Sequence, residues 1–238
     1  MVCVLFRIFN IKIYLCVKNN IRESVIMKEY LNKIRRPVVD SPMKLKLIKS
    51  IGIAILGLTL GLIQKWIDGK AINELPKIFE VLDIGNYFGG LSIWILLATV
   101  ISIYSKSPLR AGINVLIFFI SMLTGYYWYS NYILGFFPKS YMLIWAMFSF
   151  VSFFLAYICW YAKGKGIIAI LISAIIVGVL FSQSVLILQG IRVVSVLGFI
   201  AWFVGVFVLY RKAKELTFML GISIVVAIIY QYFALYYG

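Results

Sequence analysis

The side chains best suited to bind a small molecule are five amides and one tyrosine that lie near the ends of long apolar runs. Amides donate and accept hydrogen bonds, and a tyrosine ring also binds a cation through its face. A pocket lined by such groups suits a neutral or cationic ligand. In the alternative interpretation, the amides bond to neighbouring helices or lie at hydrated helix ends. The candidate ligand-binding residues are Gln64, Asn86, Tyr127, Asn131, Gln183 and Gln231.

Groups that could perform catalysis are missing from the same runs. The chain has no histidine, and no Asp, Glu, Lys or Arg lies in the central part of any apolar run. Cys3, Cys16 and Cys159 form no CxxC pair, so no metal-ligating set is recognisable. The sequence predicts a non-enzymatic protein with no catalytic residue, no metal site and no cofactor. Proton-coupled transport is disfavoured because nothing in the apolar centre titrates.

Helices that cross a membrane must position these residues. The 238 residues are 63% hydrophobic and 13% charged, with a mean hydropathy of +1.02, whereas a soluble domain has about 25% charged residues. A helix of about 20 apolar residues crosses a hydrocarbon core about 30 Å thick. The sequence therefore predicts an all-α, polytopic transmembrane helix bundle. Its seven predicted spans are 45–66, 86–104, 111–132, 139–162, 166–188, 191–210 and 216–236.

The break between the fifth and sixth spans is the weakest in the chain. Only Gln189, Gly190 and Arg192 separate the two spans, although glycine favours a turn. Without a turn at this point, the count falls to six. Seven spans place the two termini on opposite sides of the membrane, whereas six would return the C-terminus to the N-terminal side.

Lys and Arg are unevenly distributed between the two sides of the predicted bundle. With the N-terminus inside, the inner segments hold 18 of them and the outer segments hold 5. Cations are retained on the cytoplasmic side. The sequence thus predicts a multi-pass protein of the cell membrane with a cytoplasmic N-terminus and an extracytoplasmic C-terminus. Under this topology the candidate ligand-binding residues lie near outer helix ends, and a pocket among them would open outward.

Residues 1–42 form a basic leader that differs from the transmembrane helical domain at 43–238. Cations next to a membrane span are ordinary topology determinants that also attract anionic lipid. The lipid bilayer is therefore the predicted partner, and nucleic acid is not. The leader is interpreted either as an interfacial anchor or as a poorly ordered extension upstream of a start near Met27 or Met43.

Small residues predict a close helix contact in the first span. Gly57 and Gly61 form a GxxxG motif with Ala54 nearby, and such motifs let a second helix approach closely. The contact is interpreted as intramolecular packing, with a dimer contact as the alternative.

Three stretches are similar to those of a known family. They are YSKSPLRA at 104–111, LGFFPKSY at 134–141 and CWYAKGKG at 159–166. From about residue 43 onward, the chain resembles an uncharacterised family of small bacterial multi-pass membrane proteins, described as a domain of unknown function. That resemblance implies the fold and no activity.

Two classes of function remain open. In the first, the protein binds a small molecule from the outer face or serves as the membrane subunit of a transporter. In size, hydrophobicity and lack of an ATPase motif, it resembles the substrate-binding subunits of energy-coupling-factor vitamin transporters, although seven spans depart from the six expected there. In the second, it is a structural, regulatory or immunity-type membrane protein without a ligand.

Overall fold

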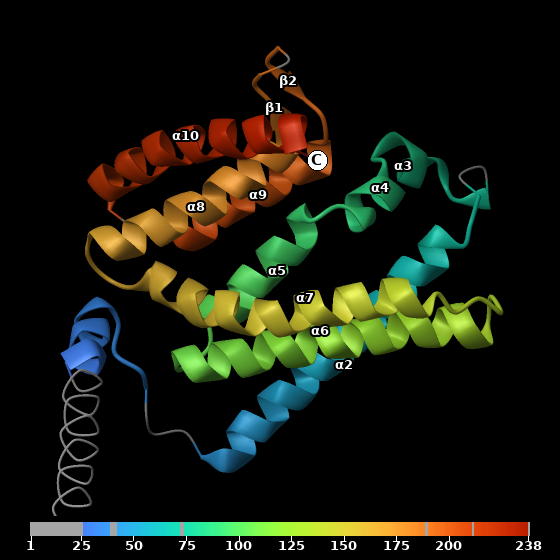
Figure 1. Ribbon diagram of the computed structural model, residues 1–238, viewed down its shortest axis with the longest axis horizontal. Helices are drawn as coiled ribbons and strands as arrows, with labels where there is room; N and C mark the ends of the chain where they lie inside the picture. Colours follow the sequence, from blue (N-terminus) through green and yellow to red (C-terminus); the bar gives the residue numbers. More distant parts are fainter. Residues whose placement is uncertain (1–25, 39–41, 72–73, 189, 211, 238) are drawn as a thin grey trace, which may run out of the picture.

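The computed structural model of the chain describes residues 26–38, 42–71, 74–188, 190–210 and 212–237 (Figure 1). Almost all of its regular structure is helical, with one two-stranded hairpin. The longer helices are α2 (Met43–Asp68), α5 (Ser92–Ile103), α6 (Pro108–Tyr132), α7 (Lys139–Cys159), α8 (Ile167–Ser184), α9 (Val196–Leu209) and α10 (Ala213–Tyr237). The short elements are α3 (Lys77–Val81), α4 (Ile84–Gly89), the 3-10 helix η2 (Trp160–Lys163), β1 (Val185–Leu186) and β2 (Arg192–Val193).

The prediction of an all-α membrane protein is confirmed at the level of helix type and length. Within the described residues, five helices are long and apolar enough to cross a membrane: α2, α6, α7 with η2, α8 and α10. The other two predicted spans contain shorter helices, because α5 has 12 residues and α9 has 14. At a rise of 1.5 Å per residue, these helices reach only about 18 and 21 Å.

Two local features shorten these helices. The predicted span 86–104 is interrupted at Gly89 and Gly90, where α4 ends and Gly90 is extended. Two adjacent glycines make helix continuation costly. The predicted break between the fifth and sixth spans is confirmed, and it is an antiparallel hairpin in which Val185 pairs with Val193 around a turn containing Gly190 at φ +96°.

The long helices form two groups that α5 connects (Figure 1). In one group α2 and α7 pack on α6, and in the other α9 and α10 pack on α8. The short helix α5 contacts α6 and α7 in the first group and α8 and α9 in the second. Its buried Trp94 belongs to one apolar cluster and its buried Leu96 to another. Helix α5 is therefore the shared core element of the bundle.

The helix termini define two ends of the bundle. At one end α2, α6, α8 and α10 begin, and α5, η2 and α9 end. We call this the basic end because its turns, the start of α2 and residues 26–38 together carry most of the lysines and arginines that the structure describes. Lys163 joins two of these turns by donating from Nζ to the carbonyl oxygens of Val208 (2.6 Å) and Tyr210 (3.3 Å). The opposite end holds β1, β2, α3 and α4, and we call it the hairpin end.

The first span lies very close to α6. A Cβ atom at Gly57 would overlap the carbonyl oxygen of Phe118, and one at Gly61 would overlap that of Met122. Both glycines are buried, and Ala54, one turn before Gly57, is partly buried. The small residues singled out in the sequence thus lie at a contact between α2 and α6 of the same chain.

Part of the predicted leader, residues 26–38, docks against the basic end. Residues 26–34 are helical, and the Ile34 side chain is 8% exposed. Arg35 donates from Nη1 to the carbonyl oxygen of Trp160 (2.6 Å) and from Nη2 to that of Ile103 (2.7 Å), and its guanidinium lies 4.1 Å from the Trp160 ring centroid. Burial lowers the pKa of Arg35, an effect that Cys159 opposes. The segment therefore ties the ends of α5 and α7 together.

Candidate functional site

The structure places the six candidate ligand-binding residues in separate surroundings at the hairpin end. Gln64 of α2 donates from Nε2 to the carbonyl oxygen of Phe88 (3.0 Å), which the Trp94 indole also uses (2.9 Å). That carbonyl is freed because α4 ends at Gly89. Asn86 donates to the Asp83 carboxylate (2.8 Å) at an exposed position. The Gln64 bond to Phe88 thus connects α2 to the break between α4 and α5.

Gln183 and Gln231 lie close together between α8 and α10. Gln183 donates to the Tyr230 hydroxyl (3.0 Å). The Gln231 side chain is 4% exposed, and its Nε2 donates to the carbonyl oxygen of Val185 (2.6 Å) while its Oε1 accepts from the backbone N–H of Ile187 (2.9 Å). Gln231 therefore supplies the hydrogen bonds that the end of α8 and the start of the hairpin would otherwise lack.

Tyr127 and Asn131 of α6 form a third group. Tyr127 is buried and packs edge-on against Tyr126 and Phe137. Asn131 is exposed. Tyr127 thus lies on α6, whereas Gln183 and Gln231 belong to α8 and α10 of the other helix group. Binding of a ligand by these six residues stays a prediction.

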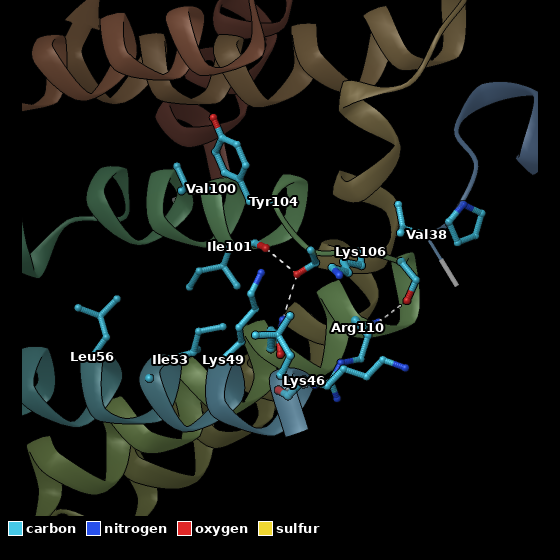
Figure 2. A pocket seen from close by; sticks show the side chains of 16 residues that line it. Val38, Lys46, Lys49, Ile53, Leu56, Val100, Ile101, Tyr104, Lys106 and Arg110 are labelled. Atoms are coloured by element: carbon cyan, nitrogen blue, oxygen red, sulfur yellow. Dashed lines mark hydrogen bonds between the residues drawn. The ribbon is translucent and has the colours of Figure 1, made fainter. Parts of the chain in front are cut away.

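The cavity that stands out lies at the basic end, between α2, α5 and α6. It has a volume of about 580 Å³. Four cationic side chains border it: Lys46 and Lys49 from α2, Lys106 from the turn between α5 and α6, and Arg110 from the first turn of α6. Pro37 and Val38 of the docked segment also line it. We call this cavity the basic pocket (Figure 2).

Local sequence explains how the four cations come together. Ser107 accepts a hydrogen bond from the backbone N–H of Arg110 (3.3 Å), and Pro108 occupies the first position of α6. This serine cap and proline start α6 directly after α5 ends, which brings Lys106 and Arg110 to one turn. Lys46 and Lys49, three residues apart on α2, share a helix face that borders the same cavity.

A chain of hydrogen bonds fixes the floor of the basic pocket. Arg110 donates from Nη2 to the Ser50 hydroxyl (3.1 Å), which donates to Asn114 Oδ1 (3.1 Å). Asn114 in turn donates to the Ser105 hydroxyl (3.1 Å). The Trp160 indole donates to the Ser105 carbonyl oxygen (2.7 Å). Because Ser50, Ser105 and Asn114 are buried and bonded to one another, the network holds Arg110 in a fixed position.

The positive charge of the basic pocket is left without a negative partner in the described residues. Arg110 bonds to neutral oxygens, those of Ser50 and the Lys46 carbonyl (2.8 Å). Among the described residues, an ion pair is found between Lys70 and Glu74, which lie at the opposite, hairpin end. Like charges held together repel one another and raise the electrostatic potential around the basic pocket.

The polar and apolar parts of the basic pocket are separated in space. Figure 2 shows Lys106 and Arg110 toward one end of the pocket and Ile53 and Leu56 toward the other, with Lys49 between them. Ile101 of α5 faces this apolar part from the opposite side. The pocket is therefore amphipathic along its length.

Sequence reasoning does not predict this pocket, although the cations that border it are evident in the sequence. On sequence alone, cations near span ends such as Lys46, Lys49, Lys106 and Arg110 are sufficiently explained as topology determinants. The missed signal is the buried amide Asn114, which lies at the inner end of a span and needs a polar partner. That partner is the network beneath the cations.

Together, the fold and composition fit a membrane-embedded helical protein with a basic, amphipathic pocket at one end of its helices. Comparison of the chain with protein-family models, curated proteins and solved structures finds no match in any of the three. The resemblance to an uncharacterised family of small bacterial membrane proteins stays a prediction.

Proposed function

We propose that the chain is a non-enzymatic, multi-pass protein of the cell membrane whose basic pocket binds a phosphate-bearing ligand at the cytoplasmic face. One observation carries this proposal: Lys46, Lys49, Lys106 and Arg110 border one cavity without an ion-pair partner in the described residues. Guanidinium and ammonium groups bind phosphate through charge-assisted hydrogen bonds. Several cations around one cavity suit a phosphate, because it carries more than one negative charge.

The proposal includes seven spans with the basic end inside. The helices alternate in direction, with α2, α6, α8 and α10 starting at the basic end and α5, α7 and α9 running back toward it. The excess of cations at the basic end favours the cytoplasm for that side, so the C-terminus lies outside. Alkaline phosphatase fused after Gly238 should be active and a fused green fluorescent protein dark; the reverse pattern would contradict this orientation.

The short helices α5 and α9 are compatible with this count. Helix α5 is surrounded by α6, α7, α8 and α9, and the Phe88 carbonyl oxygen that the break before it frees accepts hydrogen bonds from the Gln64 and Trp94 side chains. Non-helical backbone at membrane depth is tolerated where protein covers it. The hairpin after α8 is likewise hydrogen-bonded to Gln231, which donates to the Val185 carbonyl oxygen and accepts from the Ile187 N–H.

The test of the function is equilibrium binding to the purified full chain in a neutral detergent. The probes are inorganic phosphate, glycerol phosphate and dioleoyl phosphatidic acid, with dioleoyl phosphatidylcholine as the reference. At least one of the three anionic probes should bind more tightly than phosphatidylcholine, whose phosphate is neutralised by its own choline cation. Lys49→Gln and Lys106→Gln remove charge without removing any hydrogen bond found among the described residues, and each should weaken binding about 5-fold, since a cation near a membrane surface contributes about 1 kcal/mol.

A matched control is Lys165→Gln. Lys165 lies at the same end and is exposed, but does not line the basic pocket. Its backbone N–H, which bonds to the Ile34 carbonyl oxygen (2.7 Å), is unchanged by the substitution. Binding by this variant should stay within about 2-fold of the parent, because salt screens a charge outside the site. Equal losses in all three variants would show diffuse attraction rather than a site.

A second candidate is a structural, regulatory or immunity-type membrane protein without a ligand. The observation that favours it is the use of Gln183 and Gln231 in bonds between α8 and α10, which leaves these amides committed within the protein. Gentle purification from the native membrane followed by native mass spectrometry distinguishes the candidates. A stoichiometric protein partner with no bound anion would favour this second class.

A further inference from the structure

We infer that the ligand of the basic pocket is a membrane lipid with an anionic phosphate head group. Its acyl chain lies in the apolar part of that pocket, between α2 and α5, which we call the groove. This inference rests on the proposed function and specifies its ligand. The head group would contact Lys46, Lys106 and Arg110, and the chain would extend past Lys49 along Ile53 and Leu56.

The shape of the pocket favours a lipid over a free anion. A free phosphate would occupy only the cationic end, whereas the cavity of about 580 Å³ continues along α2 from Lys46 to Leu56. These residues are ten positions apart, which corresponds to about 15 Å of helix. A ligand that fills this length must carry an apolar portion, because Ile53, Leu56 and Ile101 offer no hydrogen-bonding side chains.

The groove is also continuous with the apolar exterior of the bundle. Leu45 and Leu56 both line it, and their side chains are 39% and 44% exposed. In a membrane-embedded protein, an exposed apolar side chain on a long span contacts acyl chains. A lipid can therefore enter sideways with its chain leading along the helices, while its phosphate stays near the cytoplasmic surface, where basic pockets between helices bind anionic lipid.

Gly52 provides the open space on the α2 side of this groove. It lines the pocket, and a Cβ atom built there meets nothing within 4 Å. Leucine at this position would occupy the groove without displacing the backbone. Gly221 of α10 is a matched position, because a Cβ there also meets nothing within 4 Å and the residue is exposed but lies outside the pocket.

The experiment compares lipid and soluble head group on the full chain and its variants. Dioleoyl phosphatidic acid and dioleoyl phosphatidylcholine are added to protein in neutral detergent and their retention is counted by native mass spectrometry, while glycerol phosphate binding is measured by calorimetry. We expect phosphatidic acid to bind at least 100-fold more tightly than glycerol phosphate. Gly52→Leu should weaken phosphatidic acid about tenfold, as loss of contact with about two methylene groups would, and Gly221→Leu should not.

A second pair of variants guards against misfolding of Gly52→Leu. Leu56→Gln places a polar group in the groove, and Ile55→Gln places the same group on the neighbouring residue, which is exposed and outside the pocket. Only Leu56→Gln should weaken phosphatidic acid, and neither should change the binding of glycerol phosphate.

The outcomes separate this inference from the proposed function. Glycerol phosphate binding as tightly as phosphatidic acid, with no effect of Gly52→Leu or Leu56→Gln, would overturn the lipid and leave an anion site in place. Equal retention of phosphatidic acid and phosphatidylcholine, with no soluble anion bound, would overturn both.

Discussion

The two ends of the bundle use polar side chains in opposite ways. At the hairpin end, Gln183 and Gln231 bond to other parts of the protein, and Gln231 is buried with both its amide oxygen and its nitrogen engaged. At the basic end, the neutral groups are likewise bonded to one another, but Lys49 and Lys106 border a cavity without an ion-pair partner in the described chain.

This difference separates structural polarity from polarity available to a ligand. A buried polar group whose hydrogen bonds are complete stabilises the fold, and its loss leaves other groups unsatisfied. A cation without a counter-ion contributes little to the fold and retains its attraction for an anion. The position of a polar residue near a membrane surface is therefore a weaker guide to function than what its atoms contact.

The largest stability effect is expected at the hairpin end. Gln231→Ala removes the side chain that bonds to Val185 and Ile187 and leaves those backbone groups unsatisfied. We expect a loss of about 3 kcal/mol in unfolding free energy, since each buried group left unpaired costs about 1–3 kcal/mol. Denaturation of the purified protein in detergent, followed by circular dichroism, measures it.

Gln183→Ala is the matched control for that substitution. Gln183 is half-buried and makes one hydrogen bond, to the Tyr230 hydroxyl, so its loss should cost about 1 kcal/mol. An unperturbed Gln231→Ala protein that loses a bound ligand instead would reverse the comparison and restore an outward-facing binding site.

An intermediate effect is expected for Arg35, the cation at the basic end that has structural contacts. Arg35→Gln removes two bonds to the carbonyl oxygens of Trp160 and Ile103, near the ends of two helices, and the contact with the Trp160 ring. Charge-assisted bonds contribute about 1.5–3 kcal/mol, so we expect a loss of about 2 kcal/mol. Chemical denaturation measures this change.

The neighbouring Arg36 gives the control, because it is exposed and bonds to nothing in the described residues. Arg36→Gln should change the unfolding free energy by less than about 0.5 kcal/mol. Similar losses in both variants would mean that residues 26–38 act through their net charge rather than through the Arg35 contacts.

Sequence reasoning predicted the helices because apolar length is a local property. Each of the seven predicted spans contains a helix, and the break near Gly190 was recognised from the glycine. The form of that break, a hairpin with Val185 paired to Val193, depends on contacts with α10 and could not be predicted locally. The same holds for the break at Gly89 and Gly90, where Gln64 from another helix bonds to the freed carbonyl of Phe88.

The basic pocket could not be predicted because its parts are distant in sequence. Lys49 and Lys106 are brought together by the packing of α2 on α6 through Gly57 and Gly61, and a pattern of cations alone does not report that packing. Arg35 was one of many cations in the leader, and nothing local distinguishes it from Arg36. Its role follows from carbonyl groups in α5 and η2, more than 60 residues away.

The smallest expected effects are changes in stability that have opposite signs at the two ends of the bundle. Lys49→Gln combined with Lys106→Gln removes two of the four like charges that border the basic pocket, so delipidated protein should become more stable by a few tenths of a kcal/mol at low salt. At the hairpin end, Lys70→Gln breaks the exposed ion pair with Glu74 (3.4 Å) and should cost a similar amount. Both changes should fade at about 1 M salt, where screening acts within about 3 Å.

Adding the ligand should reverse the sign of the stability difference between the double lysine variant and the parent. With phosphatidic acid present, the two lysines bind an anion, and a ligand that binds only the folded state stabilises it in proportion to its affinity. The double variant should then gain less thermal stability from the lipid than the parent does, whereas Lys70→Gln should gain as much. A lysine pair that stabilises the lipid-free protein would show that its charge is already neutralised within the chain, and the contrast between the two ends would fail.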